Sequence, residues 1–213
     1  MIQSSAKKLS RKELLNGYRT QSLMEATRKV IARGGFDAVT MERVSAEAGL
    51  TKGAVYLYFP NKEQLILAAV EEISSEMVER IAAAVDAEAP PWERLSQTLR
   101  AELKIMEEQK DLIRVLLLDR RLFRDGPGHH ARRLFKYRDR HEERLRQCLE
   151  DGMRKRIFRT MDTAQAAFYI NEMAVSAAGR RMMGRSGQTL ERDTEELLNF
   201  VGLLVRKHAR TSG

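Results

Sequence analysis

The chain lacks the features that mark a secreted or membrane protein. Its 213 residues include one cysteine, Cys148, so no disulfide can form within the chain, and this fits a reducing cytoplasm. No apolar run approaches the roughly 18 residues that a membrane-spanning helix needs. The first residues, MIQSSAKKLSRKELL, are basic and polar and do not read as a secretion signal. We therefore expect a cytoplasmic protein with no membrane partner.

Signatures of catalysis and of metal binding are also missing. The sequence has no glycine-rich phosphate loop, no nucleophile elbow and no paired metal-ligand spacing. His129 and His130 are adjacent and would point to different sides of a helix, and His141 lies far along the chain. We expect no enzyme activity, no catalytic residue, no metal and no cofactor.

Helical periodicity runs through almost the whole chain. A hydrophobic content of 43% beside 32% charged residues is ordinary for a folded globular protein. Apolar residues recur three and four positions apart, and no segment alternates as a strand does. The fold class is therefore predicted to be all-α. The predicted helices are one ending at Gly34-Gly35, 40–48, 51–58, one starting at Asn61, one from Trp92, the apolar segment 111–123, 129–155, 163–183 and 190–208. Their predicted N-terminal caps include Thr40, Thr51, Asn61 and Asp162. The segment 124–130, RDGPGHH, is predicted to be a loop.

The charges are unevenly distributed. Residues 1–62 carry 11 Lys and Arg against 5 Asp and Glu, a net charge of +6. Residues 63–119 carry −7, and residues 120–159 carry +8. A basic module attracts polyanions, chiefly nucleic acid, through counterion release and steering. We predict two domains, a nucleic-acid-binding domain over 1–62 and a helical domain over 63–213.

Two short predicted helices, 40–48 and 51–58, are joined at Gly49, which is typical of a helix-turn-helix. In that motif the second helix lies in the major groove of DNA. The four-residue spacing of Val55 and Phe59 predicts that both face inward, against Val44 and Leu50. The same spacing predicts that Lys52 and Tyr56 face outward.

The outward residues suit contact with a duplex. Lys52 can meet a phosphate or a guanine edge, and tyrosine hydroxyls can reach phosphate oxygens. Gly53 would allow a close approach of the backbone to DNA, although a packing glycine between helices is an equal alternative. Tyr56 and Tyr58 have the alternative of being simple surface aromatics. The predicted DNA-binding residues are Thr40, Thr51, Lys52, Gly53, Ala54, Tyr56, Tyr58 and Lys62.

The stretch EATRKVIARGGFDAVTMERVSAEAGLTKGAVYLYFPNKEQL, residues 25–65, resembles the N-terminal domain of the TetR family of bacterial transcriptional repressors, and the resemblance spans about residues 20–66. The matching features are the Gly35-Phe36 pair, Thr40, the turn 48–51 (Ala-Gly-Leu-Thr), Gly53, Tyr56, Tyr58-Phe59 and Lys62-Glu63. Ser45 and Thr27 depart from the family pattern, but both are small and neither threatens the fold.

The resemblance implies a dimeric repressor that releases operator DNA when a small-molecule effector binds the C-terminal domain. It also implies that the last two long helices form the dimer. The predicted dimer residues are Phe168, Asn171, Val175, Ala178, Leu197, Val201, Leu204 and Val205. The predicted effector-binding residues are Met106, Leu117, Arg121, Phe168 and Met173, and the arginine-rich segment 120–159 would suit an amphipathic anion.

Several alternatives stay open at this level. The basic run 120–159 has the alternative of a solvated helix face. Basic residues of the first 12 positions would form either an arm in the minor groove or a solvated tail. The whole chain has the alternatives of a helical enzyme or carrier with a vestigial helix-turn-helix, and of a DNA-binding regulator that has lost its effector pocket.

Overall fold

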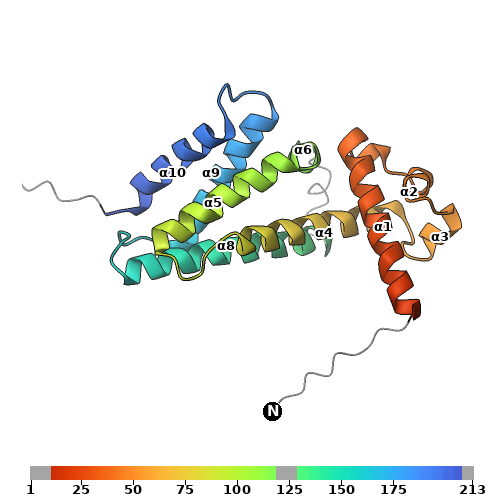
Figure 1. Cartoon of the computed structure of the whole chain (residues 1–213), viewed down its shortest axis with the longest axis horizontal. Coiled ribbons are helices and arrows are strands. Elements are labelled where there is room, and N and C mark those ends of the chain that lie inside the picture. Colours follow the sequence, from red (N-terminus) through yellow and green to blue (C-terminus); the bar gives the residue numbers. More distant parts are fainter. Residues whose placement is uncertain (1–10, 119–128, 208–213) are drawn as a thin grey trace, which may run out of the picture. The chain divides into compact units, whose positions relative to one another are not determined.

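The structure is a computed structural model that describes residues 11–118 and 129–207, with side chains described over 15–115 and 136–207. The chain forms two compact units, and the division falls inside one helix, between Glu72 and Ile73. Each unit is built from helices alone in the described residues, apart from one isolated bridge between Phe158 and Arg206 (Figure 1). The all-α prediction is confirmed.

The first unit holds three helices and the start of a fourth. Its elements are α1 (Arg11–Gly34), the short 3-10 turn η1 (Phe36–Ala38), α2 (Met41–Glu47), α3 (Lys52–Tyr56) and the first part of α4 (Lys62–Ala83). One side of each helix is apolar, and those sides meet in a core whose fully buried members include Leu23, Ile31, Val39, Val44, Val55 and Leu65. The predicted cap of α4 is confirmed, because the Gln64 amide donates to Asn61 Oδ1 at 2.9 Å.

In its described residues, 73–118 and 129–207, the second unit holds the rest of α4 and five further helices. They are α5 (Pro91–Glu108), α6 (Lys110–Leu118), α8 (His129–Arg154), α9 (Thr163–Met182) and α10 (Leu190–Val205). Pro91 begins α5 at a position where its missing N–H is not needed. Asp162 caps α9 by accepting from the Ala164 and Gln165 amides, both at 3.0 Å, as the sequence predicts.

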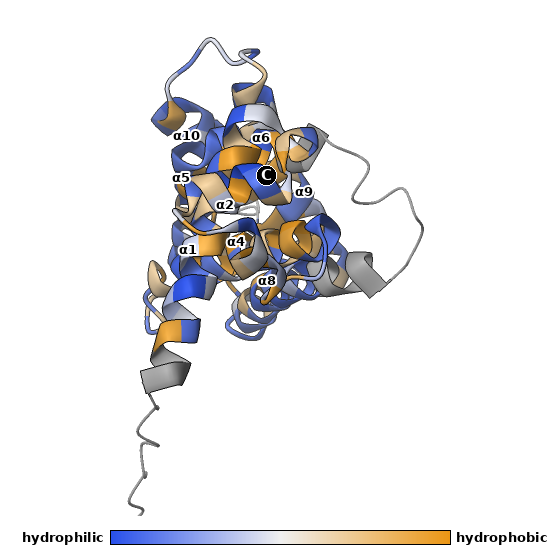
Figure 2. Cartoon of the chain, turned by 90° about the vertical axis from the view of Figure 1, so that its right-hand side faces the viewer, coloured by the Kyte–Doolittle hydropathy of each residue, from blue (hydrophilic) through white to orange (hydrophobic). Residues whose placement is uncertain are grey.

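The core of the second unit lies where α5 packs against α8, α9 and α10. Fully buried leucines such as Leu95, Leu99, Leu145 and Leu149 fill it, together with Phe158. Blue and orange residues alternate along the helices in Figure 2, which is the pattern of helices with one apolar side. Over the described ranges, no helix has the length and apolar character needed to span a membrane.

Two helix ends differ from the prediction. The helix α3 ends at Tyr56 rather than near Tyr58, since the Leu57 and Tyr58 amides bond to Ala54 and Val55 in a tight turn. The helix α10 ends at Val205 rather than near residue 208, because Arg206 becomes extended and pairs with Phe158. The predicted loop over 124–130 lies largely outside the described residues.

A buried charged pair joins α5 to α8. The carboxylate of Glu102 lies 3.3 Å from His141 Nε2, and both side chains are almost fully buried. Burial lowers the pKa of His141, but the negative charge of Glu102 and its hydrogen bond raise it by more, so the net shift is upward. Arg144 opposes that rise and Glu142 adds to it. The pair should therefore hold the imidazole protonated above its ordinary range.

This pair predicts a pH-dependent contribution to stability. A raised pKa in the folded state gives stability that is complete below the ordinary histidine pKa of about 6.5 and disappears as pH rises through the folded value. The loss of unfolding free energy caused by His141→Gln should therefore be larger near pH 6 than near pH 9, as urea unfolding would measure. A loss that grows with pH would contradict the assignment.

Candidate nucleic-acid interface and apolar groove

The turn between α2 and α3 is held by backbone geometry that favours glycine. Gly49 has a φ of 66°, in the left-handed region where other residues are strained. The Leu50 amide then bonds back to the Ser45 carbonyl at 2.9 Å and closes the end of α2. The turn thus sets the direction in which α3 leaves α2.

Each short helix starts with a threonine cap. Thr40 Oγ1 accepts from the Arg43 amide at 3.1 Å, and Thr51 Oγ1 accepts from the Ala54 amide at 3.2 Å. Both bonds use an oxygen lone pair and leave the hydroxyl hydrogen for another acceptor. For Thr40 that acceptor is the Glu42 carboxylate, and this hydrogen bond helps to lower the pKa of Glu42. Thr51 is exposed and Thr40 is half-buried.

The inner side of α3 is closed as predicted. Val55 and Val44 are fully buried, and Leu50 and Phe59 are half-buried beside them. The inward prediction for these four residues is confirmed for the two valines and holds in part for the other two.

The outer side of α3 presents Lys52, Gly53 and Tyr56 to solvent. The Tyr56 side chain is 47% exposed, and Lys52 Nζ lies 5.9 Å from the centre of its ring. A Cβ built on Gly53 would meet nothing within 4 Å, so no packing inside the chain requires glycine there. Lys62 is exposed at the start of α4, and Ala54 is half-buried.

Tyr58 differs from Tyr56. Its ring is half-buried, and its hydroxyl donates to Asn16 Oδ1 on α1 at 3.2 Å. Tyr58 is therefore tied to α1, whereas Tyr56 projects freely from the surface.

An ion pair that the sequence does not predict joins α2 to α3 across the turn. The Lys52 ammonium contacts the Glu42 carboxylate of α2, and both side chains are about half exposed. The hydrogen bond between them lowers the pKa of Glu42 and raises the pKa of Lys52. The two residues are ten positions apart on different helices, so no periodicity rule within one helix could have found the pair.

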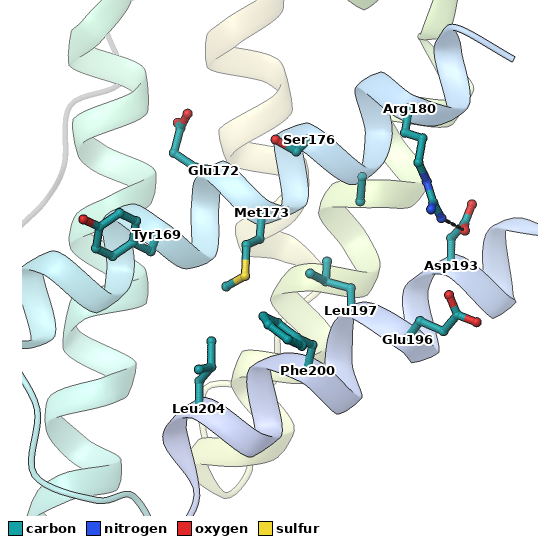
Figure 3. A pocket seen from close by; sticks show the side chains of 11 residues that line it. Tyr169, Glu172, Met173, Ser176, Arg180, Asp193, Glu196, Leu197, Phe200 and Leu204 are labelled. Carbon is teal, nitrogen blue, oxygen red and sulfur yellow. Dashed lines mark hydrogen bonds and ion pairs between the residues drawn. The ribbon is translucent and has the colours of Figure 1, made fainter. Parts of the chain in front are cut away.

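The last two helices leave a groove of about 670 Å³ between them (Figure 3). Its floor is mainly apolar, with Met173 and Leu197 beside Phe200 and Leu204. Phe168, Tyr169, Phe200 and Leu203 are exposed, each by more than 40%. Large exposed apolar side chains on two neighbouring helices, beside an apolar groove, are typical of a protein-binding surface.

A buried carboxylate fixes one end of that groove. Asp193 of α10 accepts from Arg180 and Arg181 of α9, both at 2.7 Å, and from Ser186. Arg181 also reaches Glu107 of α5 at 3.2 Å. Burial alone would raise the pKa of Asp193, but these three donors lower it overall. The network ties α5, α9 and α10 together.

The residues predicted for the dimer differ in how exposed they are. Val175 is half-buried and Leu204 is 37% exposed, while Phe168 is exposed. The other five lie inside the protomer, with little surface for a second copy: Asn171, Ala178, Leu197, Val201 and Val205. Tyr169, Phe200 and Leu203 are exposed but are not among the predicted dimer residues, although Phe200, Leu203 and Leu204 share helical spacing.

The residues predicted for the effector are not gathered in one described site. Met106 is buried in the core, whereas Met173 and Phe168 lie on α9. Leu117 belongs to α6, but its side chain is outside the described set, and Arg121 lies outside the described residues altogether. Within the described part, no group of three or more His, Cys, Asp or Glu side chains is placed to hold a metal.

Two family models match the chain. Bacterial regulatory proteins of the tetR family match residues 23–69, and the tetracyclin repressor-like C-terminal domain matches residues 88–179. The HTH-type transcriptional regulator BetI of Rhizobium meliloti (strain 1021) is 33% identical over 86 residues, which is 40% of this chain and 42% of that protein. The matched region spans about half or less of the curated relatives' own length, with shares of 35%, 42% and 51% in three of them.

Solved structures resemble nearly the whole chain. One from Saccharomonospora viridis in complex with choline has a TM-score of 0.79 at 18% identity, covering 90% of this chain and all of that one (100%). The regulator FadR from Bacillus subtilis in complex with stearoyl-CoA has a TM-score of 0.74 at 19% identity, covering 85% and 96%. At these identities the likeness shows a shared fold. The helix-turn-helix, the family matches in both units and this shared fold together show that the chain belongs to the TetR family of bacterial transcriptional regulators.

Proposed function

We propose that this chain is a homodimeric repressor that binds operator DNA through its first unit and releases it when a small-molecule effector binds its second unit. It acts by binding rather than by catalysis, in the cytoplasm, where bacterial DNA lies. The observation that carries the proposal is the two-sided α3, with Val55 buried on one side and Lys52, Gly53 and Tyr56 exposed on the other.

Each exposed residue has a role in this proposal. Lys52 and Tyr56 enter the major groove, and Gly53 lets the backbone of α3 approach the duplex. The Thr51 hydroxyl and Lys62 bind phosphate oxygens and fix the register. Thr40 contributes by capping α2 and by its hydrogen bond to Glu42. Tyr58 acts differently, because its bond to Asn16 holds α3 against α1.

The dimer forms through the exposed apolar face of α9 and α10. A second copy of Phe168, Tyr169, Phe200, Leu203 and Leu204 would cover this face. Two-fold symmetry then places the two α3 helices so that they read half-sites about one helical turn, or a multiple of it, apart.

The effector site lies in the second unit, and we propose an amphipathic anion for it on the charge of the segment 120–159. Arg138 and Arg146 of that segment already pair with carboxylates, such as Glu172 at 2.6 Å and Glu143 at 2.6 Å. The basic residues that precede them, Arg121 included, are therefore the ones proposed to meet the effector. The two ligand-bound neighbours hold a cation, choline, and an anion, stearoyl-CoA, so the fold accepts both classes.

The DNA-binding proposal is tested with Lys52→Ala and Tyr56→Ala. Lys52→Ala removes a cation and leaves the Glu42 carboxylate facing a polyanion, so operator affinity should fall at least about tenfold, or about 1.4 kcal/mol. Tyr56→Ala should also weaken binding, and affinity of the unchanged protein should fall steeply with added salt. Gel shifts on DNA fragments retained by the purified protein measure all three. Unaltered affinity in both variants, with folding intact, would refute the role of α3.

Gly53→Ala distinguishes a glycine that lets the backbone approach DNA from a glycine that only packs between helices. Open space surrounds the new methyl group, and alanine is the better helix former, so the stability of the first unit should rise by about 0.5 kcal/mol. Operator affinity should nevertheless fall, because the methyl group would stand between α3 and the duplex. Thermal melts and gel shifts on the same preparation measure both effects. A variant that binds DNA normally would mean that the backbone makes no close approach at residue 53.

The dimer proposal is tested with Phe200→Glu and Leu204→Glu. In a two-fold dimer each change places one unpaired carboxylate from each protomer in the apolar contact. The dimer dissociation constant should therefore rise at least about 100-fold. Analytical ultracentrifugation would measure it. Leu57→Glu, which alters a more exposed residue in the first unit, is the matched control and should leave the dimer intact. A dimer that survives both α10 changes would place the contact elsewhere.

A further inference from the structure

The ion pair between Glu42 and Lys52 stands on the surface that is proposed to face DNA. Glu42 lies in the first turn of α2, and Lys52 is the first residue of α3, so the pair bridges the two helices of the motif. Their side chains remain 60% and 51% exposed while in contact. Whatever surface the ammonium of Lys52 meets, the carboxylate of Glu42 meets as well.

A second ion pair on α2 has a different character. Glu47 pairs with Arg33 of α1 at 2.8 Å, and its side chain is only 23% exposed. That pair joins α2 to α1 and does not involve α3. The Arg33–Glu47 pair therefore fastens α2 to α1, whereas the Glu42–Lys52 pair is exposed to solvent on the surface of the motif.

A phosphate is a poor partner for the Glu42–Lys52 pair. The ammonium would be attracted to the phosphate, but the carboxylate beside it would be repelled at nearly the same distance. A base edge is a better partner, since it offers hydrogen-bond donors and acceptors side by side. The pair likewise offers donor hydrogens on Lys52 and lone pairs on Glu42.

The major-groove edge of a G·C base pair has the complementary arrangement. Guanine presents the acceptors O6 and N7, and cytosine presents the donor N4. Guanine O6 and cytosine N4 are joined by a base-pair hydrogen bond, so they lie about 2.9 Å apart. An ammonium nitrogen and a carboxylate oxygen in an ion pair are separated by about 2.8 Å. The two edges can therefore meet without the ion pair breaking.

We propose that Glu42 and Lys52 read one G·C base pair of each half-site as a unit, with Lys52 donating to guanine and Glu42 accepting from cytosine. This rests on the proposed DNA-binding function and names a residue, Glu42, that selects the sequence. The ammonium keeps one N–H on the carboxylate and directs another to O6 or N7. The carboxylate accepts the cytosine N4–H that faces the groove.

The order of the two bases matters more than their composition. Inverting the pair to C·G puts the cytosine amino group against the ammonium and the guanine oxygen against the carboxylate, so both contacts become repulsive. Because the ion pair already fixes the lysine side chain, little ordering is left for binding. We expect the inversion to weaken binding about 10- to 100-fold.

The test starts from sites that the purified full-length protein selects out of a randomised duplex library of about 30 base pairs, long enough for two half-sites. All four base pairs are then placed, symmetrically, at each position of the selected half-site. Affinities are measured at one salt concentration for the unchanged protein, Glu42→Gln and Lys52→Gln. Glu47→Gln is the matched control, as it removes the ion pair that joins α2 to α1.

The expected result is one half-site position at which G·C to C·G inversion weakens binding of the unchanged protein as stated. Glu42→Gln and Lys52→Gln should each reduce that effect to less than about threefold and leave the other positions unchanged. Glu47→Gln should keep the full preference. Thermal melts establish that each variant is folded, and the exposure of both side chains makes folding insensitive to these changes.

Two outcomes would overturn the inference, and they are distinguishable. If Glu42→Gln tightens binding to every sequence alike, Lys52 lies on a phosphate and Glu42 merely restrains it; the repressor function would then stand without this readout. If the unchanged protein enriches no sequence from the library, the proposed DNA-binding function fails, and the readout fails with it.

Discussion

The burial of Val55 is the constraint on which the outward surface of the first unit depends. The helix α3 has only five residues, whereas isolated helices shorter than about 12 residues are marginal in water. Its position comes from its surroundings: the valine held against the core, the Thr51 cap, and the turn that Gly49 allows. Because α3 has so few residues, fixing Val55 also fixes the directions of Lys52, Gly53 and Tyr56. The buried side of α3 thus determines which side chains its exposed side presents.

Much of this arrangement can be predicted from the sequence, because the signals are local. A cap involves a side-chain oxygen and an amide two or three residues later, so the sequence alone predicts the caps at Thr40, Thr51, Asn61 and Asp162. The end of a helix depends on what the chain meets next. The end of α10 is set by the pairing of Arg206 with Phe158, nearly fifty residues earlier, and no local rule contains that information.

The sites were predicted less completely than the helices, for a related reason. Along α10 two apolar rows run side by side, one with Leu197 and Val201 in the core and one with Phe200 and Leu204 outside. Periodicity identifies the helix but does not say which row meets α5 and which meets solvent. The ion pair of Glu42 with Lys52 shows the same limit, since it depends on the angle between two helices. The sequence therefore predicts features inside one helix better than contacts between helices.

A basic surface is often assumed both to attract DNA and to select its sequence. The ion pair of Lys52 with Glu42 assigns these two tasks to different residues. The net charge of +6 over residues 1–62 acts at a distance, within a Debye length of about 8 Å at physiological salt. At contact, the charge of Lys52 is already balanced by Glu42, so this lysine adds little to the release of counterions. It retains directed hydrogen-bond donors beside a directed acceptor. Attraction to DNA would then come from the other basic residues of the first unit, and the choice of sequence from a pair with almost no net charge.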